Sequence, residues 1–226
     1  MTSRIEKAIC LVSGGMDSTV TLAIALKEYD VHAMHVMYGQ RTEERELQSF
    51  RDLVEHYGIE KILIVSMDYI QRIGASSLTD TKIDVPTKIG EMGEIPNTYV
   101  PFRNAQLLSA AVAWAEAVGA KKVFIGAVEE DSSGYPDCRE KFFKSFNQAV
   151  RDGTRPETNI EIVTPVIHLS KSQIIKKGIE LKVPFELTWS CYKNTDKACG
   201  ECESCRLRLN GFNGAGVEDP LIYEMR

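Results

Sequence analysis

Short apolar runs alternate along the chain with longer segments in which apolar residues recur every three or four positions. The short runs contain many Val and Ile residues, which is typical of strands. The longer segments have the spacing of amphipathic helices. The predicted strands are 7–13, 31–38, 61–67, 121–127 and 160–166, and the predicted helices are 17–29, 43–57, 104–118 and 171–181. This alternation predicts an α/β fold with a parallel five-stranded sheet and helices on both faces.

Two connections in this pattern are unusually long. Residues 68–101 carry Gly, Pro, Thr and Ser without a clear period, and residues 128–159 contain one evident helix, at about 139–150. Both should leave the carboxyl ends of strands, where parallel sheets bind ligands, so we expect them to form walls or lids of a site. The last part of the chain is rich in Cys, Gly and Asn. The pattern therefore predicts an α/β domain at 1–183 and a small segment at 184–226 packed on it.

The composition narrows the class of protein. The chain has 226 residues, of which 43% are hydrophobic and 26% charged, which fits one globular domain with a small appendage. A net charge of −5 without a polybasic run argues against a large nucleic-acid footprint, so we expect no stable nucleic-acid partner. The most apolar helix-length stretch, "AQLLSAAVAWAEAVGA", is shorter than a membrane span and contains Glu116. The start of the chain lacks the apolar core of a signal peptide, and we expect a cytoplasmic protein.

The hexapeptide "SGGMDS" at 13–18 joins the first predicted strand to the first predicted helix. Its glycine pair permits a turn that a Cβ would obstruct. Free backbone N–H groups and the positive dipole end at the start of a helix favour an anion. A Walker loop would carry a lysine at its end, and Lys27 lies too far along the helix to replace it. These features predict a phosphate-binding turn that works without a lysine of its own.

Four of the six cysteines lie within fifteen residues, with seven, two and two residues between them. In a cytosolic protein such a cluster favours a metal over disulfides. Four thiolates suit one tetrahedral Zn²⁺ per chain, and they leave no open position for catalysis, so the zinc would be structural. An iron–sulfur cluster is the competing interpretation, but no proline follows the last cysteine. The predicted ligands are Cys191, Cys199, Cys202 and Cys205.

"SGGMDS" matches the pyrophosphate loop of the ATP-pyrophosphatase (PP-loop) superfamily, whose fold is HUP-like. The resemblance implies that the loop holds the β and γ phosphates of ATP and presents the α-phosphate to an acceptor. It implies that Asp17 helps to hold Mg²⁺ with the ATP, and that the end of the second strand passes the adenine. The ATP-binding residues expected on this basis are Val12, Ser13, Gly14, Gly15, Met16, Asp17, Ser18, Thr19, Met37 and Tyr38.

Further segments resemble one family, the 7-cyano-7-deazaguanine synthases, from about residue 8 to residue 220. They are "YGQRTEERE", "TYVPFRNAQLLS", "DSSGYPDCREKF", "TWSCY", "CGECESC" and "GFNGAGVEDP". The chain departs from the family pattern at three places. Thr42 stands where a histidine is usual, Phe102 stands where a small residue is common, and the residues just before Gly134 differ.

The resemblance implies an ATP-dependent carbon–nitrogen ligase of queuosine and archaeosine precursor biosynthesis. It would convert 7-carboxy-7-deazaguanine and ammonia to the nitrile through an activated carboxylate and an activated amide. Asp17, Arg103 and Lys171 are the expected catalytic residues, because Mg²⁺ and cations neutralise developing charge. An exposed first-turn lysine is the alternative interpretation of Lys171.

Asp137, Arg139 and Arg103 are the expected substrate-binding residues. The carboxylate of Asp137 would accept two N–H groups from a guanine-like edge, and each arginine would hold an anionic group. Relatives in this family suggest a homodimer. Two other functions stay open, namely a PP-loop enzyme that modifies tRNA, such as a thiolase, and a zinc-knuckle module that binds nucleic acid.

Overall fold

The five predicted strands form one parallel sheet in the order β3-β2-β1-β4-β5. The computed structural model describes residues 5–87, 95–129 and 134–224. The strands are β1 Lys7–Leu11, β2 Asp30–Met37, β3 Ile62–Ser66, β4 Lys122–Ile125 and β5 Glu161–Val163. The predicted parallel α/β sheet is therefore confirmed. The last strand is shorter than predicted because Pro165, which has no N–H to donate to a sheet, follows almost at once.

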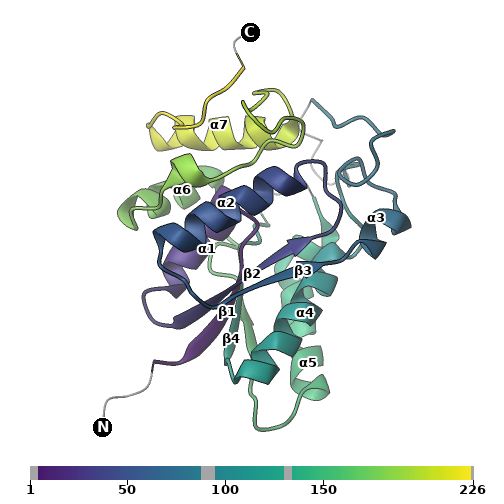
Figure 1. Ribbon diagram of the computed structural model, residues 1–226, viewed down its shortest axis with the longest axis vertical. Helices are drawn as coiled ribbons and strands as arrows, with labels where there is room; N and C mark the ends of the chain where they lie inside the picture. The colour runs from purple at the N-terminus through teal and green to yellow at the C-terminus, as the bar shows by residue number, and fades with distance from the viewer. Residues whose placement is uncertain (1–4, 88–94, 130–133, 225–226) are drawn as a thin grey trace.

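Both faces of the sheet are covered by helices (Figure 1). The alternation of side chains along β1 explains this arrangement. Ala8 and Cys10 pack against apolar residues of α1 and α2, whereas Ile9 and Leu11 pack against those of α4 and α5 on the opposite face. All four side chains are buried, as expected for a central parallel strand. The helices are α1 Met16–Ala25, α2 Glu43–His56, α4 Arg103–Val118 and α5 Glu140–Gly153.

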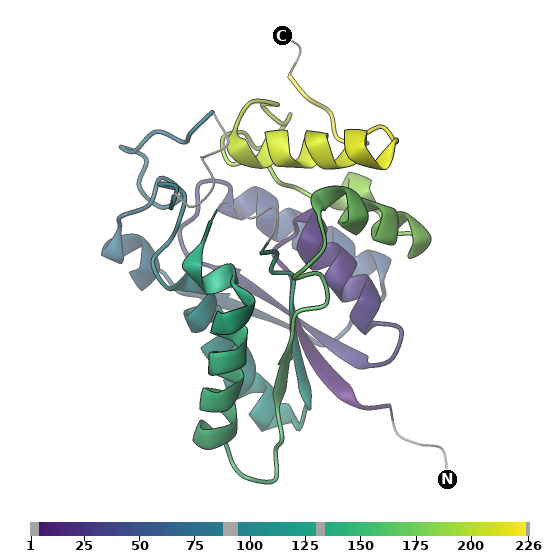
Figure 2. The same ribbon diagram turned by 180° about the vertical axis from the view of Figure 1, so that it is seen from behind.

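A further pair of helices, α6 Lys171–Glu180 and α7 Glu203–Ala215, lies beyond α1. In Figures 1 and 2, α7 crosses the top of the molecule above α6. We did not predict α7, because its sequence contains two glycines and lacks a continuous apolar stripe. The packing accounts for one of them, since a Cβ on Gly211 would lie 2.8 Å from the Cβ of Lys171. Glycine at this position lets α7 approach α6 closely.

The two long connections leave the carboxyl ends of strands, as predicted. The first connection contains the short helix α3 Tyr69–Ile73. The part of this connection that follows α3 is hydrogen-bonded to Arg41. The guanidinium of Arg41 donates to the carbonyl oxygens of Ser77 and Ile83, each over 2.6 Å. The second connection contains the 3₁₀ turn η1 Pro136–Cys138 and the predicted helix, α5. Residues 130–133, which include part of the departure from the family pattern before Gly134, lie outside the described residues.

None of the helices in the described ranges is long and apolar enough to cross a membrane. The apolar stretch that contains Glu116 forms most of α4, and its side chains Leu108, Ala111 and Ala115 are buried against the sheet. Its low polarity is therefore explained by packing on the α/β core.

Candidate active site

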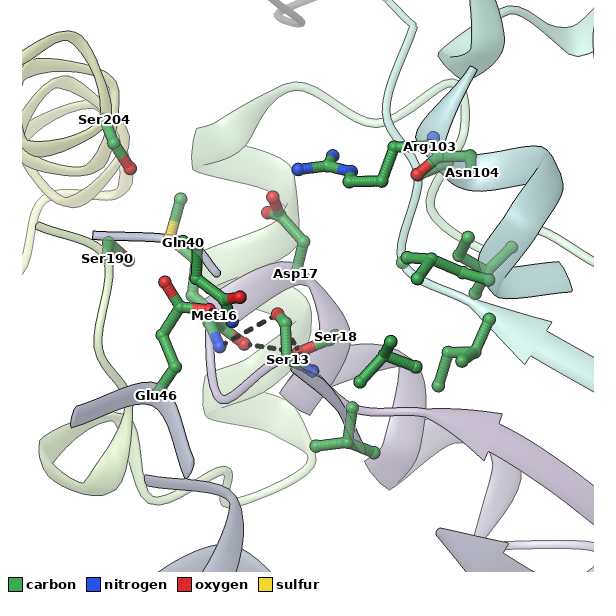
Figure 3. Close-up of a pocket in the computed structure, with 18 of the residues that line it drawn as sticks. Ser13, Met16, Asp17, Ser18, Gln40, Glu46, Arg103, Asn104, Ser190 and Ser204 are labelled. Carbon is green, nitrogen blue, oxygen red and sulfur yellow. Dashed lines mark hydrogen bonds between the residues drawn. The ribbon is translucent and has the colours of Figure 1, made fainter. Parts of the chain in front are cut away.

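A cavity of about 280 Å³ opens at the carboxyl ends of β1, β2 and β4. This is the edge at which the strand order reverses beside β1, where open parallel sheets bind ligands. One part of its wall is apolar and includes Leu11, Val36 and Ile125 at the ends of the three strands. The remaining wall is polar and aromatic. It is formed by the turn at 13–18, by the residues after β2, by the start of α4, and by the C-terminal segment (Figure 3).

The turn at 13–18 is held by its own serines. The Oγ of Ser18 donates to the carbonyl of Gly15 over 2.9 Å and accepts from the backbone N–H of Ser13 over 3.2 Å. Gly14 has φ +88°, and a Cβ there would lie 2.8 Å from the Cβ of Ser49. Only glycine fits this turn without displacing α2. The turn therefore places the start of α1 at the cavity with its backbone geometry fixed, as binding of phosphates requires.

The structure separates the predicted ATP-binding residues into two groups. Gly14, Thr19 and Met37 do not line the cavity. Gly14 packs against α2, and the Oγ1 of Thr19 donates to the carbonyl of Gly15 over 2.8 Å, so both support the turn from behind. The predicted residues that line the cavity are Val12, Ser13, Gly15, Met16, Asp17, Ser18 and Tyr38.

Asp17 and Lys171 form an ion pair at the cavity, with Oδ2 and Nζ 2.6 Å apart. The side chain of Lys171 is 12% exposed, which excludes a solvated first-turn lysine. The other carboxylate oxygen of Asp17, Oδ1, is buried and has no hydrogen-bond partner among the described residues. A carboxylate oxygen of this kind is a ligand that Mg²⁺ prefers, so Asp17 fits the metal that the superfamily resemblance implies.

Arg103 lies at the start of α4, where its guanidinium faces two tyrosines. Its Nη1 donates to the hydroxyl of Tyr38 over 2.9 Å, and the guanidinium lies 5.5 Å from the ring centre of Tyr38 and 6.0 Å from that of Tyr135. Burial raises the pKa of Tyr38 to about 12, although the charge of Arg103 acts in the opposite direction. The tyrosine therefore stays a neutral acceptor for Arg103, and the positive charge remains available to an anion in the cavity.

The structure does not bring Asp137 and Arg139 to the cavity wall. Asp137 is buried in η1, and its Oδ2 accepts the backbone N–H of Asn104 over 2.9 Å. This carboxylate therefore caps the start of α4. Arg139 precedes the first residue of α5. Of this segment, Cys138 does line the cavity, and burial raises the pKa of its thiol to about 11, which disfavours a nucleophilic thiolate.

Glu46 on α2 is a cavity residue that we did not predict from the sequence. Its Oε2 accepts from Nε2 of Gln40 over 3.0 Å, and its Oε1 accepts from Oγ1 of Thr42 over 2.9 Å. Burial raises the pKa of the Glu46 carboxyl to about 7, against the effect of these two bonds. The polar run "YGQRTEERE" contains all three residues, but their convergence depends on how α2 packs against the turn at Gly14.

Gly126, just after β4, is a second cavity residue that we did not predict from the sequence. It lines the cavity, and a Cβ there would lie 2.7 Å from the carbonyl carbon of Asp17 and from the nitrogen of Ser18. Its lack of a side chain lets the end of β4 approach the first turn of α1. The sequence signal was the single glycine that follows the apolar run "KVFI".

The four predicted metal ligands converge. The sulfur atoms of Cys191, Cys199, Cys202 and Cys205 all lie within 4.8 Å of one another, and all four side chains are buried. Backbone N–H groups of Asn194 and Cys202 point to two of these sulfurs, over 3.3 Å in each case. A tetrahedral Zn²⁺ with bonds of about 2.3 Å needs sulfurs about 3.8 Å apart. The cluster can therefore hold a metal such as zinc.

Arg208 on α7 connects the cysteine segment to the rest of the protein. Its side chain is fully buried, and Nε and Nη2 donate to the two carboxylate oxygens of Asp219 over 2.7 and 2.9 Å. Nη1 donates to Oγ1 of Thr188 over 2.6 Å. The next residue, Trp189, donates its backbone N–H to the carbonyl of Gly14 over 2.8 Å. The C-terminal segment also supplies cavity wall, namely Trp189, Ser190, Tyr192, Ser204 and Leu207.

The comparisons with known proteins agree with this geometry. The sequence profile described as "Queuosine biosynthesis protein QueC" matches residues 7–216. The chain belongs to the QueC family. A relative from Chlorobium chlorochromatii (strain CaD3), a "7-cyano-7-deazaguanine synthase", is 57% identical over 221 residues, which are 97% of each chain. A protein of the same description from Chlorobaculum parvum is 55% identical over the same share of both chains. The family predicted from the sequence motifs is thereby confirmed.

The fold assignment has support from a distant solved structure. The "4-thiouridine synthetase - RNA complex with bound ATP" superposes with a TM-score of 0.52 at 15% identity. The match covers 96% of this QueC-family chain and 47% of the other. At this identity the likeness concerns the fold alone. It agrees with the predicted α/β fold.

Proposed function

We propose that the chain catalyses the ATP-dependent conversion of 7-carboxy-7-deazaguanine and ammonia to 7-cyano-7-deazaguanine. Its family and its relatives named "7-cyano-7-deazaguanine synthase" support this assignment. The observation that carries it is the cavity itself. One wall is a lysine-free phosphate turn at the start of α1, and the same space is lined by aromatic side chains, Tyr38, Tyr135, Trp189 and Tyr192. Such a cavity suits a nucleotide next to a flat heterocycle.

The chemical difficulty is that a carboxylate oxygen is a poor leaving group. Attack of a substrate carboxylate oxygen on the α-phosphorus of ATP releases pyrophosphate and forms an acyl adenylate. Ammonia then attacks the acyl carbon, AMP leaves with that oxygen, and the amide forms with loss of a proton. A second ATP activates the amide oxygen in the same way, with release of pyrophosphate, and departure of AMP with loss of both amide protons gives the nitrile. One turn that holds the outer phosphates can serve both activations.

Charge develops at the departing pyrophosphate, and the residues around the turn can neutralise it. Lys171 lies within 2.6 Å of Asp17 and can reach the outer phosphates from α6. Mg²⁺ held by Asp17 would supply Lewis-acid stabilisation of the same phosphates. Arg103 would hold the anionic carboxylate of the substrate, because its guanidinium is the cation on the opposite side of Asp17 from Ser13 in Figure 3. No covalent intermediate on the protein is needed, so Cys138 takes no chemical part.

The proposal extends to the other groups expected from the sequence. One structural Zn²⁺ bound by the four cysteines would fold the C-terminal wall of the cavity. Ammonium in solution would lose a proton, and the resulting ammonia would enter the site. The homodimer, the cytoplasmic location, and the boundary between residues 183 and 184 stay predictions. The substrate-binding roles expected of Asp137 and Arg139 are not part of the proposal, because neither residue lines the cavity.

Incubation of the purified protein with ATP, ammonium and 7-carboxy-7-deazaguanine tests the function. We expect mass spectrometry to detect the amide first and then the nitrile, with AMP formed in step. A reaction without ATP should leave the carboxylate unchanged. Absence of the nitrile would reject the assignment, and a product formed only with intact tRNA would favour the tRNA-modifying alternative.

A further inference from the structure

The substrate of the proposed function has an edge that the catalytic residues do not recognise. The deazaguanine ring presents an N1–H and a 2-amino group side by side, and both are hydrogen-bond donors. A carboxylate, which only accepts, can take both at once. A carboxylate on the cavity wall, away from the phosphates, would therefore select this heterocycle.

Two carboxylates are found among the described residues that line the cavity, those of Asp17 and Glu46. Asp17 begins the phosphate-binding helix and is paired with Lys171. Asp137, our candidate from the sequence, is off the wall and accepts the N–H that starts α4. We infer that Glu46 recognises the N1–H and 2-amino edge of the heterocycle and so determines the specificity of the site. This inference rests on the proposed function.

Glu46 is held ready for this task. Each of its carboxylate oxygens accepts one hydrogen bond from the protein, from Gln40 and from Thr42. A carboxylate oxygen has two acceptor positions, so each oxygen keeps one for a ligand. The amide of Gln40 is itself fixed, because its Oε1 accepts the backbone N–H of Tyr38 over 2.9 Å. This bond turns the NH₂ group of Gln40 toward Glu46 and fixes the direction of the carboxylate.

The surroundings of Glu46 fit a flat ring with an anionic substituent at its far end. Tyr38 and Trp189 line the same cavity and offer aromatic faces. In Figure 3, Glu46 lies to the left of Ser13 and Ser18, and the guanidinium of Arg103 lies above them, beyond Asp17. A ring whose donor edge meets Glu46 would thus direct its carboxylate toward the phosphate turn and Arg103.

The electrostatics of Glu46 agree with this arrangement. Burial raises the pKa of its carboxyl to about 7, and the neighbouring charge of Glu43 acts in the same direction. The bonds from Gln40 and Thr42 and the charge of Arg103 oppose the shift. Two N–H donors from a bound ring would favour the ionised carboxylate further. The free site is therefore short of donors at Glu46, and the deazaguanine edge supplies them.

Comparison of two ligands on matched variants tests the inference. The ligands are 7-carboxy-7-deazaguanine and 7-carboxy-7-deazahypoxanthine, which lacks the 2-amino group. Titration calorimetry gives the Kd of each for the wild-type protein, Glu46→Gln, Glu43→Gln and Asp137→Asn. Glu43 is the matched control, because it lies on the same helix, accepts the N–H of Gly39, and does not line the cavity.

We expect the wild type to prefer the 2-amino ligand by about 10- to 100-fold, as for hydrogen bonds to a charged group. Glu46→Gln should bind the two ligands within about threefold of each other, because an amide cannot accept two N–H groups on separate oxygens. Glu43→Gln and Asp137→Asn should keep the wild-type preference. Retention of the preference in Glu46→Gln, or its loss in Asp137→Asn, would overturn the inference.

Two further measurements distinguish a failure of this inference from unfolding of a variant and from failure of the proposed function. Thermal melting shows whether each variant is folded, and Glu46→Asp, which keeps the charge but shortens the side chain, replaces Glu46→Gln if that variant unfolds. Nitrile formation by the wild type tests the proposed function separately. If the wild type forms the nitrile and Glu46→Gln still discriminates the ligands, only the role of Glu46 fails. If the wild type forms no nitrile, the function fails and this inference falls with it.

Discussion

The backbone N–H of Trp189 donates to the carbonyl oxygen of Gly14 over 2.8 Å, which joins the cysteine-rich segment to the turn at 13–18. Trp189 lies two residues before Cys191, the first predicted metal ligand. Its indole ring is buried under the guanidinium of Arg45, which lies 4.6 Å from the ring centre. The order of the turn at 13–18 is thus connected to the order of the four-cysteine cluster through one short segment.

Removal of the metal should therefore affect the phosphate turn as well as the cysteine segment. Metal binding and folding are coupled in small cysteine clusters. Removal of a metal that binds only the folded state should therefore lower the unfolding free energy by about 3 kcal/mol or more. For a chain of this size that is roughly 6–12 °C in Tm. Hydrogen exchange measured by mass spectrometry should show faster exchange at residues 13–18, and added Zn²⁺ should reverse it. Unchanged exchange at these residues in metal-free protein would contradict the coupling.

Gly14→Ala should abolish ATP binding. The new Cβ would lie 2.8 Å from the Cβ of Ser49 and 2.9 Å from the carbonyl oxygen of Glu46, at a φ of +88°. The clash and the strained backbone together should cost about 2–4 kcal/mol of stability. Gly119→Ala is a matched control, because Gly119 has a similar φ of +73° and a Cβ added there would meet no atom within 4 Å.

The control should lose only about 1–2 kcal/mol, the strain of a left-handed alanine, and should bind ATP normally. Urea unfolding and calorimetric titration with ATP measure both effects. Equal losses of stability in the two variants, with ATP binding intact in each, would show that the close packing of Gly14 is unimportant.

Much of the fold could be predicted because its signals are local. The apolar run of β1 and the glycine pair at Gly14 can each be recognised from a few consecutive residues. The helix α7 was missed because Gly211 is needed for a close contact with Lys171, and that residue is forty positions away in the sequence. A glycine in a helical pattern otherwise lowers the expectation of a helix.

The sequence identified the residues that form the turn at 13–18 and the four cysteines that converge, but it did not identify which acidic residue of the substrate region lines the cavity. "SGGMDS" and the cysteine spacing are compact motifs whose residues must act together. Asp137 and Glu46 are both acidic residues in polar segments, and the sequence does not say which of them faces the cavity. That depends on the turn η1, which directs Asp137 to the backbone of Asn104, and on the packing of α2.

Lys171→Met should lower kcat by about 10²–10³ while leaving the fold intact, as is typical when a group that stabilises developing charge is lost. The substitution keeps the aliphatic stem and removes the charge that lies 2.6 Å from Asp17. Lys177→Met, on the same helix, is the control, because Lys177 is 42% exposed and pairs with Glu180 outside the cavity. If both variants retain full turnover in the nitrile assay, Lys171 has only a structural role.

The stability of the protein should depend on pH through Glu46. The pKa of this carboxyl is about 7 in the folded protein, above its ordinary value of 4.5. Between these two values the folded state binds the proton more tightly than the unfolded state, so the unfolding free energy falls as the pH rises. Glu46→Gln removes this contribution. The unfolding free energy of the wild type relative to that of the variant should therefore be greater at about pH 5 than at about pH 8.

Urea unfolding of both proteins at the two pH values measures this difference, and taking the difference cancels the titration of all other groups. Glu43→Gln again serves as the control, because Glu43 lies one turn earlier on α2 and its carboxylate accepts the N–H of Gly39 away from the cavity. Its stability relative to the wild type should change much less with pH, because the charge of Glu43 is the smallest of the named effects on the pKa of Glu46. Parallel pH profiles for the wild type and Glu46→Gln would mean that Glu46 is already ionised in the folded protein near about pH 5. Burial would then not hold its proton, and the cavity would be more open to water at α2 than its two hydrogen bonds to Gln40 and Thr42 indicate.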